Sequence, residues 1–270
     1  MKNNIYFLGP KGTYSEIAAN KIIQKLNLDY NLMPISTISK IVDLLENNSS
    51  DVAVLPIENS IEGIVRPTID SLYATNVKIK AQTEISIAHC LFSFCPKEKI
   101  KCIVSHPQAL AQCQKYILNN FDNEIKLIET TSTAAAVEIV EQNKDSYAAI
   151  CSKKAGKNLN LIDENIGDIK DNKTRFVFVT KSGFDLPQKN RTSIVFNTKN
   201  ESGALLKILE IVYKYNLNLI YLESRPSKKV FGEYNFFADI DSGVDSLSMP
   251  LGEIEKACNF YKMLGSYPTV

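Results

Sequence analysis

Short apolar runs alternate with longer amphipathic ones through the first two thirds of the chain. Parallel sheets with crossover helices require this alternation, because each buried strand is followed by a helix that covers the sheet. We therefore predict an α/β fold. The expected strands lie near residues 4–8, 51–55, 100–104, 125–129, 147–150 and 175–180, and the expected helices near 14–26, 37–47, 67–74, 107–119 and 132–142.

A long alternating stretch at residues 77–94 interrupts this pattern. Apolar residues recur at every second position from Val77 to Ala81 and again at Ile85 and Ile87, which is typical of extended chain. We predict that this stretch crosses between two α/β lobes, the second of them spanning about residues 80–160. Two lobes joined by extended segments imply a cleft between them.

Residues 181–190 collect Gly, Pro, Asp and Asn between two β-rich runs and indicate a domain boundary. We expect a first domain over 1–182 and a second over 190–270. The second has the predicted order strand 192–198, helix 203–215, strand 217–224, hairpin strand 230–240, helix 251–257 and strand 259–264. This βαββαβ order is typical of a ferredoxin-like module. Pro250 and Gly252 weaken the prediction of its second helix, since both residues are unfavourable in a helix interior.

The charge balance argues against several classes of partner. The 270 residues include 31 Lys and Arg and 30 Asp and Glu, so the net charge of +1 gives no global attraction to nucleic acid or to an anionic membrane. The longest apolar runs are far shorter than the roughly 18 residues of a membrane span, and the polar start does not resemble a secretory signal. We expect a cytoplasmic protein.

The composition also disfavours metal and cofactor chemistry. The six cysteines include no C-x-x-C pair, and most lie in apolar stretches, where a free thiol behaves as a small hydrophobe. With only His89 and His106, a zinc site dominated by histidine cannot be assembled. We expect neither a metal nor a cofactor, and we expect His106, which precedes Pro107, to mark a helix start.

Several segments place polar residues where a strand gives way to a helix. Thr13 and Glu16 have the spacing of a capping box in a glycine-rich loop, and such a helix start can also hold an anion. Ligands of open α/β folds bind beyond the carboxyl ends of strands, so these segments could converge on one pocket, with ordinary helix capping as the alternative for each. The candidates are Glu58, Asn59, Ser60, Ser105 as a helix cap, Gln112, Ser132, Thr133 and Ala134.

Residues 171–176, Asp-Asn-Lys-Thr-Arg-Phe, precede the last predicted strand of the first domain. Arginine occurs in this lysine-rich chain only at Arg66, Arg175, Arg191 and Arg225. This suggests that arginine is retained where its planar guanidinium group makes contacts that lysine cannot make. Arg175, beside Thr174 at a strand start, is suited to clamp a carboxylate. A solvated surface arginine is the alternative.

Eight motifs, taken in order, carry a family resemblance. Residues 9–15 (Gly-Pro-Lys-Gly-Thr-Tyr-Ser), 56–60 (Pro-Ile-Glu-Asn-Ser), 105–113, 132–136 and 172–176 resemble prephenate dehydratase, and residues 203–209, 223–226 and 264–268 resemble its regulatory ACT domain. The resemblance implies two lobes similar to periplasmic binding proteins, followed by an ACT domain that senses L-phenylalanine. It also implies conversion of prephenate to phenylpyruvate, water and carbon dioxide by a homodimer or homotetramer. Because no long helical segment precedes Gly9, we expect a monofunctional chain.

By the same resemblance, Thr174 is the catalytic residue that helps hydroxide to leave the substrate. The resemblance further implies substrate binding by Asn59, Ser60, Ser105, Gln112, Ser132, Thr133, Ala134 and Arg175. A cation on the ring carboxylate would stabilise the charge that must be lost as carbon dioxide, so Arg175 should not hold that group.

The resemblance implies an effector site shared between two ACT domains. L-phenylalanine is expected at Gly203, Ala204 and Leu205 on one wall and at Asn218, Leu219, Glu223, Ser224, Arg225 and Pro226 on the other. Ser202 stands where the family usually has proline, which leaves this loop less rigid. Two alternatives stay open: an arogenate dehydratase, and an amino acid sensor without chemistry, for which residues 174–176 would have no purpose.

Overall fold

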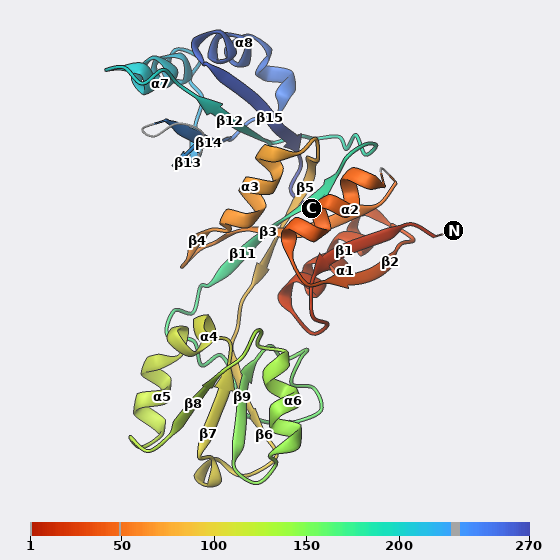
Figure 1. Ribbon diagram of the computed structural model, residues 1–270, viewed down its shortest axis with the longest axis vertical. Helices are drawn as coiled ribbons and strands as arrows, with labels where there is room; N and C mark the ends of the chain where they lie inside the picture. Colours follow the sequence, from red (N-terminus) through yellow and green to blue (C-terminus); the bar gives the residue numbers. More distant parts are fainter. Residues whose placement is uncertain (1, 49, 228–232) are drawn as a thin grey trace.

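The computed structural model describes residues 2–48, 50–227 and 233–270, and these residues form three sheets (Figure 1). The first sheet has the order β2-β1-β3-β11-β5, with β4 paired to β3. Strands β1, β2 and β3 are parallel, whereas β11 is antiparallel to both β3 and β5. The strands are β1 (Asn4–Leu8), β2 (Asn31–Ile35), β3 (Val52–Asn59), β4 (Gly63–Ile64), β5 (Lys78–Ser86) and β11 (Lys173–Thr180).

Three helices cover the two faces of this sheet. Helices α2 (Ile38–Asn47) and α3 (Arg66–Ala74) pack in one apolar cluster, and α1 (Tyr14–Leu26) packs in another. One half of the predicted capping box is present at the start of α1, where Thr13 Oγ1 accepts from the Glu16 amide at 3.4 Å. The Glu16 carboxylate accepts from the amide of Gly12 rather than from that of Thr13, at 2.6 Å.

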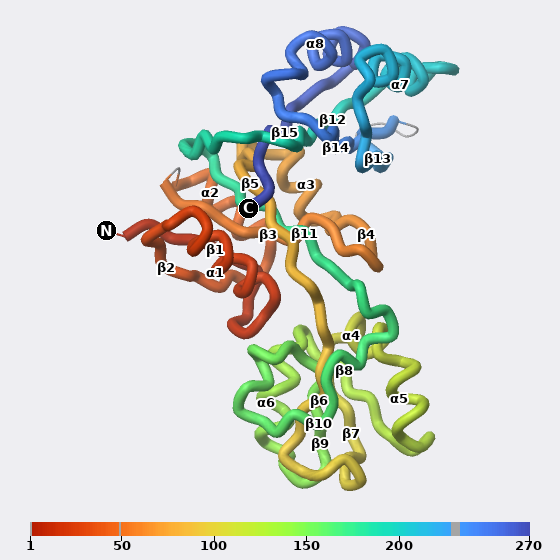
Figure 2. The backbone as a smooth tube through the Cα atoms, turned by 180° about the vertical axis from the view of Figure 1, so that it is seen from behind, coloured from red at the N-terminus to blue at the C-terminus, as the bar shows by residue number. Residues whose placement is uncertain are grey.

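The second sheet forms a separate lobe with the order β10-β6-β9-β7-β8. Its strands are β6 (Cys90–Ser93), β7 (Cys102–Ser105), β8 (Lys126–Glu129), β9 (Tyr147–Cys151) and β10 (Asn160–Asp163), and its helices are the 3-10 turn η1 (Lys97–Lys99), α4 (Pro107–Gln112), α5 (Gln114–Asn120) and α6 (Ala135–Gln142). The chain passes between the lobes twice, from β5 to β6 and from β10 to β11 (Figures 1 and 2). The predicted extended crossing at 77–94 is therefore confirmed.

The third sheet has the order β13-β14-β12-β15 and is called the C-terminal sheet below. Its elements follow the order βαββαβ: β12 (Arg191–Asn197), α7 (Ala204–Lys214), β13 (Leu219–Pro226), β14 (Tyr234–Ile240), the 3-10 turn η2 (Val244–Ser246) with α8 (Ser248–Ala257), and β15 (Phe260–Tyr267). Of the hairpin strand expected at 230–240, residues 230–232 lie outside the described residues. Pro250 is tolerated because it lies in the first turn of α8, where the missing N–H has no partner to lose.

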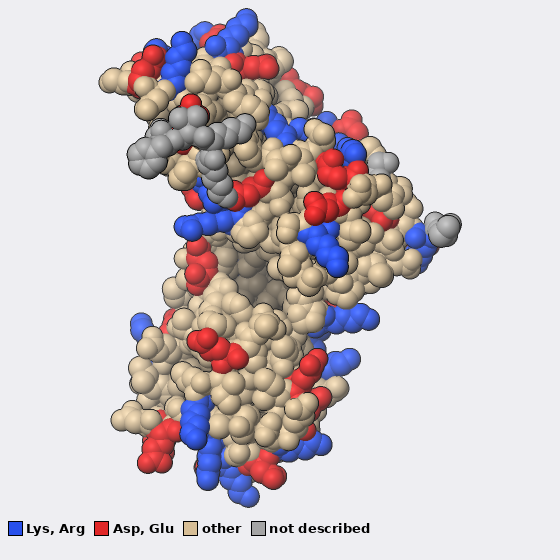
Figure 3. All heavy atoms as spheres, viewed as in Figure 1, with Lys and Arg blue, Asp and Glu red and all other residues tan. Residues whose placement is uncertain are grey.

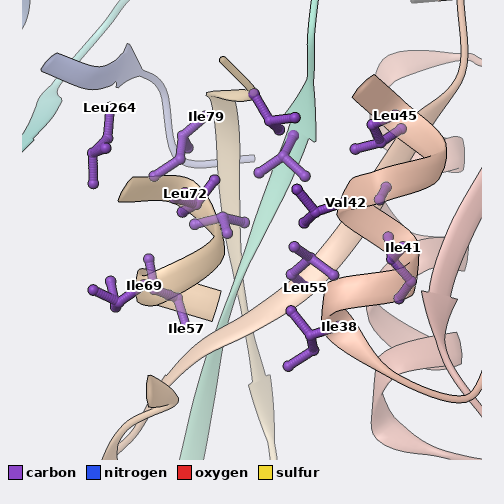
Figure 4. Close-up of a cluster of buried hydrophobic side chains, with 14 of the residues drawn as sticks. Ile38, Ile41, Val42, Leu45, Leu55, Ile57, Ile69, Leu72, Ile79 and Leu264 are labelled. Carbon is purple, nitrogen blue, oxygen red and sulfur yellow. The ribbon is translucent and has the colours of Figure 1, made fainter. Parts of the chain in front are cut away.

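The C-terminal sheet packs directly on the first lobe. Leu264 shares an apolar cluster with Ile57, Ile69, Leu72 and Ile79 of that lobe (Figure 4). Polar contacts reinforce this packing, since Lys262 Nζ donates to the backbone carbonyls of Leu72 and Tyr73 at the end of α3, each at 2.9 Å. The sheet is thus anchored to α3, β3 and β5 of the first lobe.

Several elements differ from the sequence-based prediction. The edge strands β2 and β10 were not predicted, and β3 continues to Asn59 instead of ending at residue 55. The helix predicted at 107–119 is broken at Cys113 into α4 and α5. Within the described part of the chain, no helix combines the length and the apolar character needed to cross a bilayer.

The substitution Gly265→Ala tests how closely the C-terminal sheet packs on the first lobe. A Cβ added there would lie 2.2 Å from the backbone oxygen of Ile79 in β5, so Gly265→Ala should force the two elements apart and lower the free energy of unfolding by about 1–3 kcal/mol. Gly252 is the matched control, because a Cβ there meets nothing within 4 Å and alanine favours the helix. Urea unfolding of both variants measures the effect; a Gly265→Ala protein as stable as the parent would contradict the prediction.

Candidate active site between the lobes

Thr174 lies directly opposite Asn59 where β11 pairs with the end of β3. Asn59 Nδ2 donates to Thr174 Oγ1 at 2.9 Å, while Asn59 Oδ1 accepts from the amides of Ile61 and Glu62, both at 3.0 Å. Both side chains are more than nine tenths buried. Because Thr174 Oγ1 accepts this bond and no described residue accepts from it, the hydroxyl hydrogen is available to another molecule.

A chain of amide hydrogen bonds connects this pair to the second lobe. Asn59 Nδ2 also donates to Asn172 Oδ1 at 2.7 Å, and Asn172 Nδ2 donates to Gln112 Oε1 of α4 at 3.0 Å. Gln112 Nε2 in turn donates to Glu62 Oε1 at 3.1 Å. Residues predicted separately from two lobes, Asn59 and Gln112, are therefore joined through Asn172.

A cavity of about 150 Å³ lies at this junction of the lobes. The surface is hollowed there, and the side chains around the hollow are mostly uncharged (Figure 3). Among the described residues that line the cavity, none is Asp, Glu, Lys or Arg. The lining residues are Tyr14, Asn59, Ile87, His89, His106, Gln108, Ala109, Gln112, Thr133, Asn172 and Thr174. Four predicted site residues, Asn59, Gln112, Thr133 and Thr174, are thus brought together.

His89 is a cavity residue that the sequence-based prediction missed. Its Nε2 lies 2.9 Å from Gln112 Oε1, which already accepts from Asn172, so Nε2 carries the hydrogen and Nδ1 does not. Burial lowers the pKa of His89, which keeps the ring neutral. The one available signal was its place in the stretch that crosses between the lobes.

The second lobe presents the start of α4 to the cavity. His106 caps α4, since its Nδ1 accepts from the Gln108 amide at 3.3 Å, and the prediction that it marks a helix start is confirmed. Ser105 is not the cap that was predicted: its hydroxyl is fully buried and donates to the carbonyl of Ile150 at 2.6 Å, because β7 places it inside the sheet.

Three other predicted residues lie beside the cavity without lining it. Ser60 Oγ accepts from the amide of Lys173 at 2.9 Å, and Ser132 Oγ accepts from the amide of Ala135 at 3.0 Å at the start of α6. Ala134 approaches the glycine loop of the first lobe, where a Cβ on Gly12 would lie 3.5 Å from its own. These contacts hold the loops around the cavity.

Arg175 was predicted to bind substrate, and the structure places it elsewhere. Successive residues of a strand face opposite sides, so Arg175 points away from the cavity that Thr174 lines. Its guanidinium is buried instead between Glu58 of β3, at 3.0 Å, and Asp239 of β14, at 2.7 Å.

The predicted effector residues lie in two places on the C-terminal sheet. Gly203, Ala204 and Leu205 line a cavity of about 300 Å³ at the start of α7. The other candidates lie on or next to β13, which is an edge strand, and do not line that cavity: Asn218, Leu219, Glu223, Ser224, Arg225 and Pro226. Glu223 accepts from the hydroxyl of Tyr221, and Arg225 pairs with Asp70 of α3 at 3.0 Å.

Comparisons with known proteins agree with this arrangement. Residues 5–183 match the family model described as prephenate dehydratase. A prephenate dehydratase of Methanocaldococcus jannaschii is 41% identical over 275 residues, which cover 99% of each chain. A bifunctional chorismate mutase/prephenate dehydratase of Aquifex aeolicus is 36% identical over 99% of this chain and 74% of its own length.

A solved structure extends the similarity to the whole fold. The crystal structure of prephenate dehydratase from Arthrobacter aurescens, in complex with L-Phe, superposes with a TM-score of 0.88 at 28% identity and covers 98% of this chain and 90% of that one. The chain therefore belongs to the prephenate dehydratase family, whose members are lyases that remove water and carbon dioxide from prephenate.

Proposed function

We propose that prephenate binds in the cavity between the lobes and that Thr174 donates a hydrogen bond to the hydroxyl that leaves. The observation that carries this role is the hydrogen bond from Asn59 Nδ2 to Thr174 Oγ1 at 2.9 Å, which leaves the threonine hydrogen free to point at substrate. Asn59 is fixed in turn by the amides of Ile61 and Glu62. The donor is therefore preorganised before substrate arrives, which is the condition for stabilising charge as it develops.

The step that the protein must catalyse is the cleavage of the carbon–oxygen bond of the ring. As the ring carboxylate departs as carbon dioxide, its bonding electrons enter the ring, and the carbon–oxygen bond at the opposite ring position breaks. The ring becomes aromatic, which supplies the driving force. Negative charge grows on the departing oxygen, so a hydroxyl donor aimed at that atom lowers the barrier, with a contribution typically of about 10²–10⁴ in rate.

The uncharged lining of the cavity supports a division between the two carboxylates of prephenate. A cation on the ring carboxylate would favour the ground state over the transition state. We therefore assign neutral donors such as Gln112 and Thr133 to the ring carboxylate, and the helix starts near Tyr14 and Ala135 to the pyruvyl carboxylate, which the reaction leaves unchanged. A substrate complex with a guanidinium paired to the ring carboxylate would refute this assignment.

Thr174→Val keeps the shape of the side chain and removes the donor. We expect kcat to fall about a hundredfold or more, with a modest change in KM, because the lost interaction acts mainly in the transition state. Thr174→Ser, which keeps a hydroxyl, should retain much more activity and serves as the matched control. Phenylpyruvate formation from prephenate is the assay, and near-normal turnover by Thr174→Val would remove this residue from the mechanism.

We further propose that residues 1–182 form the catalytic domain, of the two-lobed periplasmic-binding-protein type, and that residues 190–270 form an ACT-type regulatory domain. The βαββαβ order of elements and the sheet order β13-β14-β12-β15 support the second assignment. The effector would be L-phenylalanine, which is bound in the Arthrobacter aurescens structure.

The geometry of the C-terminal sheet supports an effector site completed by a second copy of the chain. The cavity beside Gly203 offers the start of α7 to a carboxylate, whereas the Glu223 side of the predicted site lies on the edge strand β13, outside that cavity. Ile220 and Leu222 on β13 are more than a third exposed, as expected of residues covered by a partner. In a homodimer or homotetramer, a second copy of the chain would complete the effector site and cover Ile220 and Leu222.

Millimolar L-phenylalanine should lower the turnover of the parent protein. Leu206 lines the cavity and is 57% exposed, so Leu206→Glu should fold normally, repel the effector carboxylate and remove the inhibition. Leu118→Glu, at a residue 64% exposed on α5, is the control and should remain inhibited. Equal activity of the parent with and without phenylalanine would contradict the regulatory proposal.

A further inference from the structure

Arg175 joins the catalytic strand to the C-terminal sheet. It follows Thr174 in β11, and its side chain is only 6% exposed. Nε donates to Glu58 Oε2 at 3.0 Å, and Nη2 pairs with Asp239 Oδ2 at 2.7 Å. Nη1 donates to Gln82 Oε1 at 3.3 Å, so each guanidinium nitrogen has a partner. The guanidinium is therefore held from two elements of the first lobe and from β14.

Asp239 is the charged partner that the C-terminal sheet contributes to this network, and the Tyr267 hydroxyl of β15 also accepts from Arg175 Nη1 at 3.5 Å. The Asp239 side chain is 7% exposed, and Oδ1 accepts from the hydroxyl of Ser193, which lies opposite it on β12. Arg191 is more distant, with Nη1 at 3.8 Å from Oδ2. Removing one partner of a buried pair leaves the other charge uncompensated, so the charge of Asp239 strongly determines where the Arg175 guanidinium rests.

This contact differs from the rest of the junction between the C-terminal sheet and the first lobe. The apolar packing around Leu264 and Ile79 holds the C-terminal sheet against the first lobe near the start of β5. The ion pair lies instead at the start of β11, where Thr174 and Arg175 are paired with Asn59 and Glu58 of β3. A shift of Arg175 therefore moves the backbone that carries the Thr174 hydroxyl.

We propose that Asp239 is a positioning residue for the dehydration: by holding Arg175, it keeps the start of β11 in place and the Thr174 hydroxyl aligned with the cavity. The inference rests on the proposed role of Thr174. Because reactive groups misplaced by about 1 Å can lose about a hundredfold in rate, a small displacement of β11 is enough to matter. The C-terminal sheet thereby acts on turnover without contributing a group to the cavity.

Asp239→Asn tests the proposal, because it keeps the shape and the hydrogen bond with Ser193 but removes the charge. We expect kcat to fall about tenfold with KM changed less than about twofold, since binding groups elsewhere in the cavity stay in place. The decisive measurement repeats the substitution in a Thr174→Val background. There Asp239→Asn should cause no further loss, because the hydroxyl that it positions is absent.

Other outcomes separate the alternatives. A merely structural role would lower kcat by the same factor in both backgrounds, and that result, like an unchanged kcat for Asp239→Asn alone, would overturn the proposal. Normal turnover by Thr174→Val would instead remove the proposed function itself. Asp51→Asn is the matched control, since Asp51 is a buried carboxylate of the first lobe that binds Tyr6 and has no contact with Arg175.

Arg175→Lys gives an independent test if Asp239→Asn does not fold. Lysine keeps the positive charge but lacks the fork that reaches Glu58 and Asp239 together. We expect the same pattern, a lower kcat with little change in KM and no additional loss in the Thr174→Val background. Additive losses would count against the proposal here as well.

Discussion

The pairing of β11 with β3 is the constraint on which the site depends. Because the two strands are antiparallel and in register at their ends, Thr174 meets Asn59 and Arg175 meets Glu58. Side chains of a strand alternate between its faces, so one pair borders the cavity and the other lies against the C-terminal sheet. A shift of one residue would exchange the two faces and place a buried arginine in the cavity.

The pairing also explains why the lobes meet where they do. Strand β11 returns from the second lobe, and Asn172, just before it, is the residue whose amide bonds both Asn59 and Gln112. The segment that enters β11 is thus also a link between the two lobes. The position of the Thr174 hydroxyl and the amide chain both depend on this return crossing, whereas Ile87 and His89 of the first crossing complete the cavity.

The strongly periodic elements could be predicted from the sequence, and the edge strands β2 and β10 could not. Buried strands such as β1 and β3 are continuous apolar runs, which is a clear signal. Strand β2 contains Asn31 and Pro34, residues that disfavour a central strand but are tolerated at an edge, and it lies at the edge of its sheet. This segment forms a strand because it pairs with β1, and its own residues give little indication of it.

The site shows the same limit at the level of single side chains. Motif order and the resemblance brought Asn59, Gln112, Thr133 and Thr174 forward, and all four line the cavity. Arg175 was predicted to bind substrate because its residue type suits a carboxylate, whereas strand alternation directs its side chain to Glu58 and Asp239, away from the cavity. His89 was missed because the crossing stretch gives no indication of which residues will face the other lobe.

The separation of charge across β11 suits the reaction. Prephenate brings two carboxylates, yet the described residues that line the cavity are uncharged, and Arg175, which follows Thr174 in β11, is engaged with Glu58 and Asp239 behind the sheet. During the reaction negative charge leaves the ring carboxylate and appears on the departing oxygen. Neutral donors fixed at that oxygen favour the later distribution, whereas a cation near the ring carboxylate would favour the earlier one. In the proposed mechanism, keeping Arg175 behind the strand therefore has two effects: it excludes a charge that would hold the carboxylate, and it anchors the strand that carries the Thr174 hydroxyl.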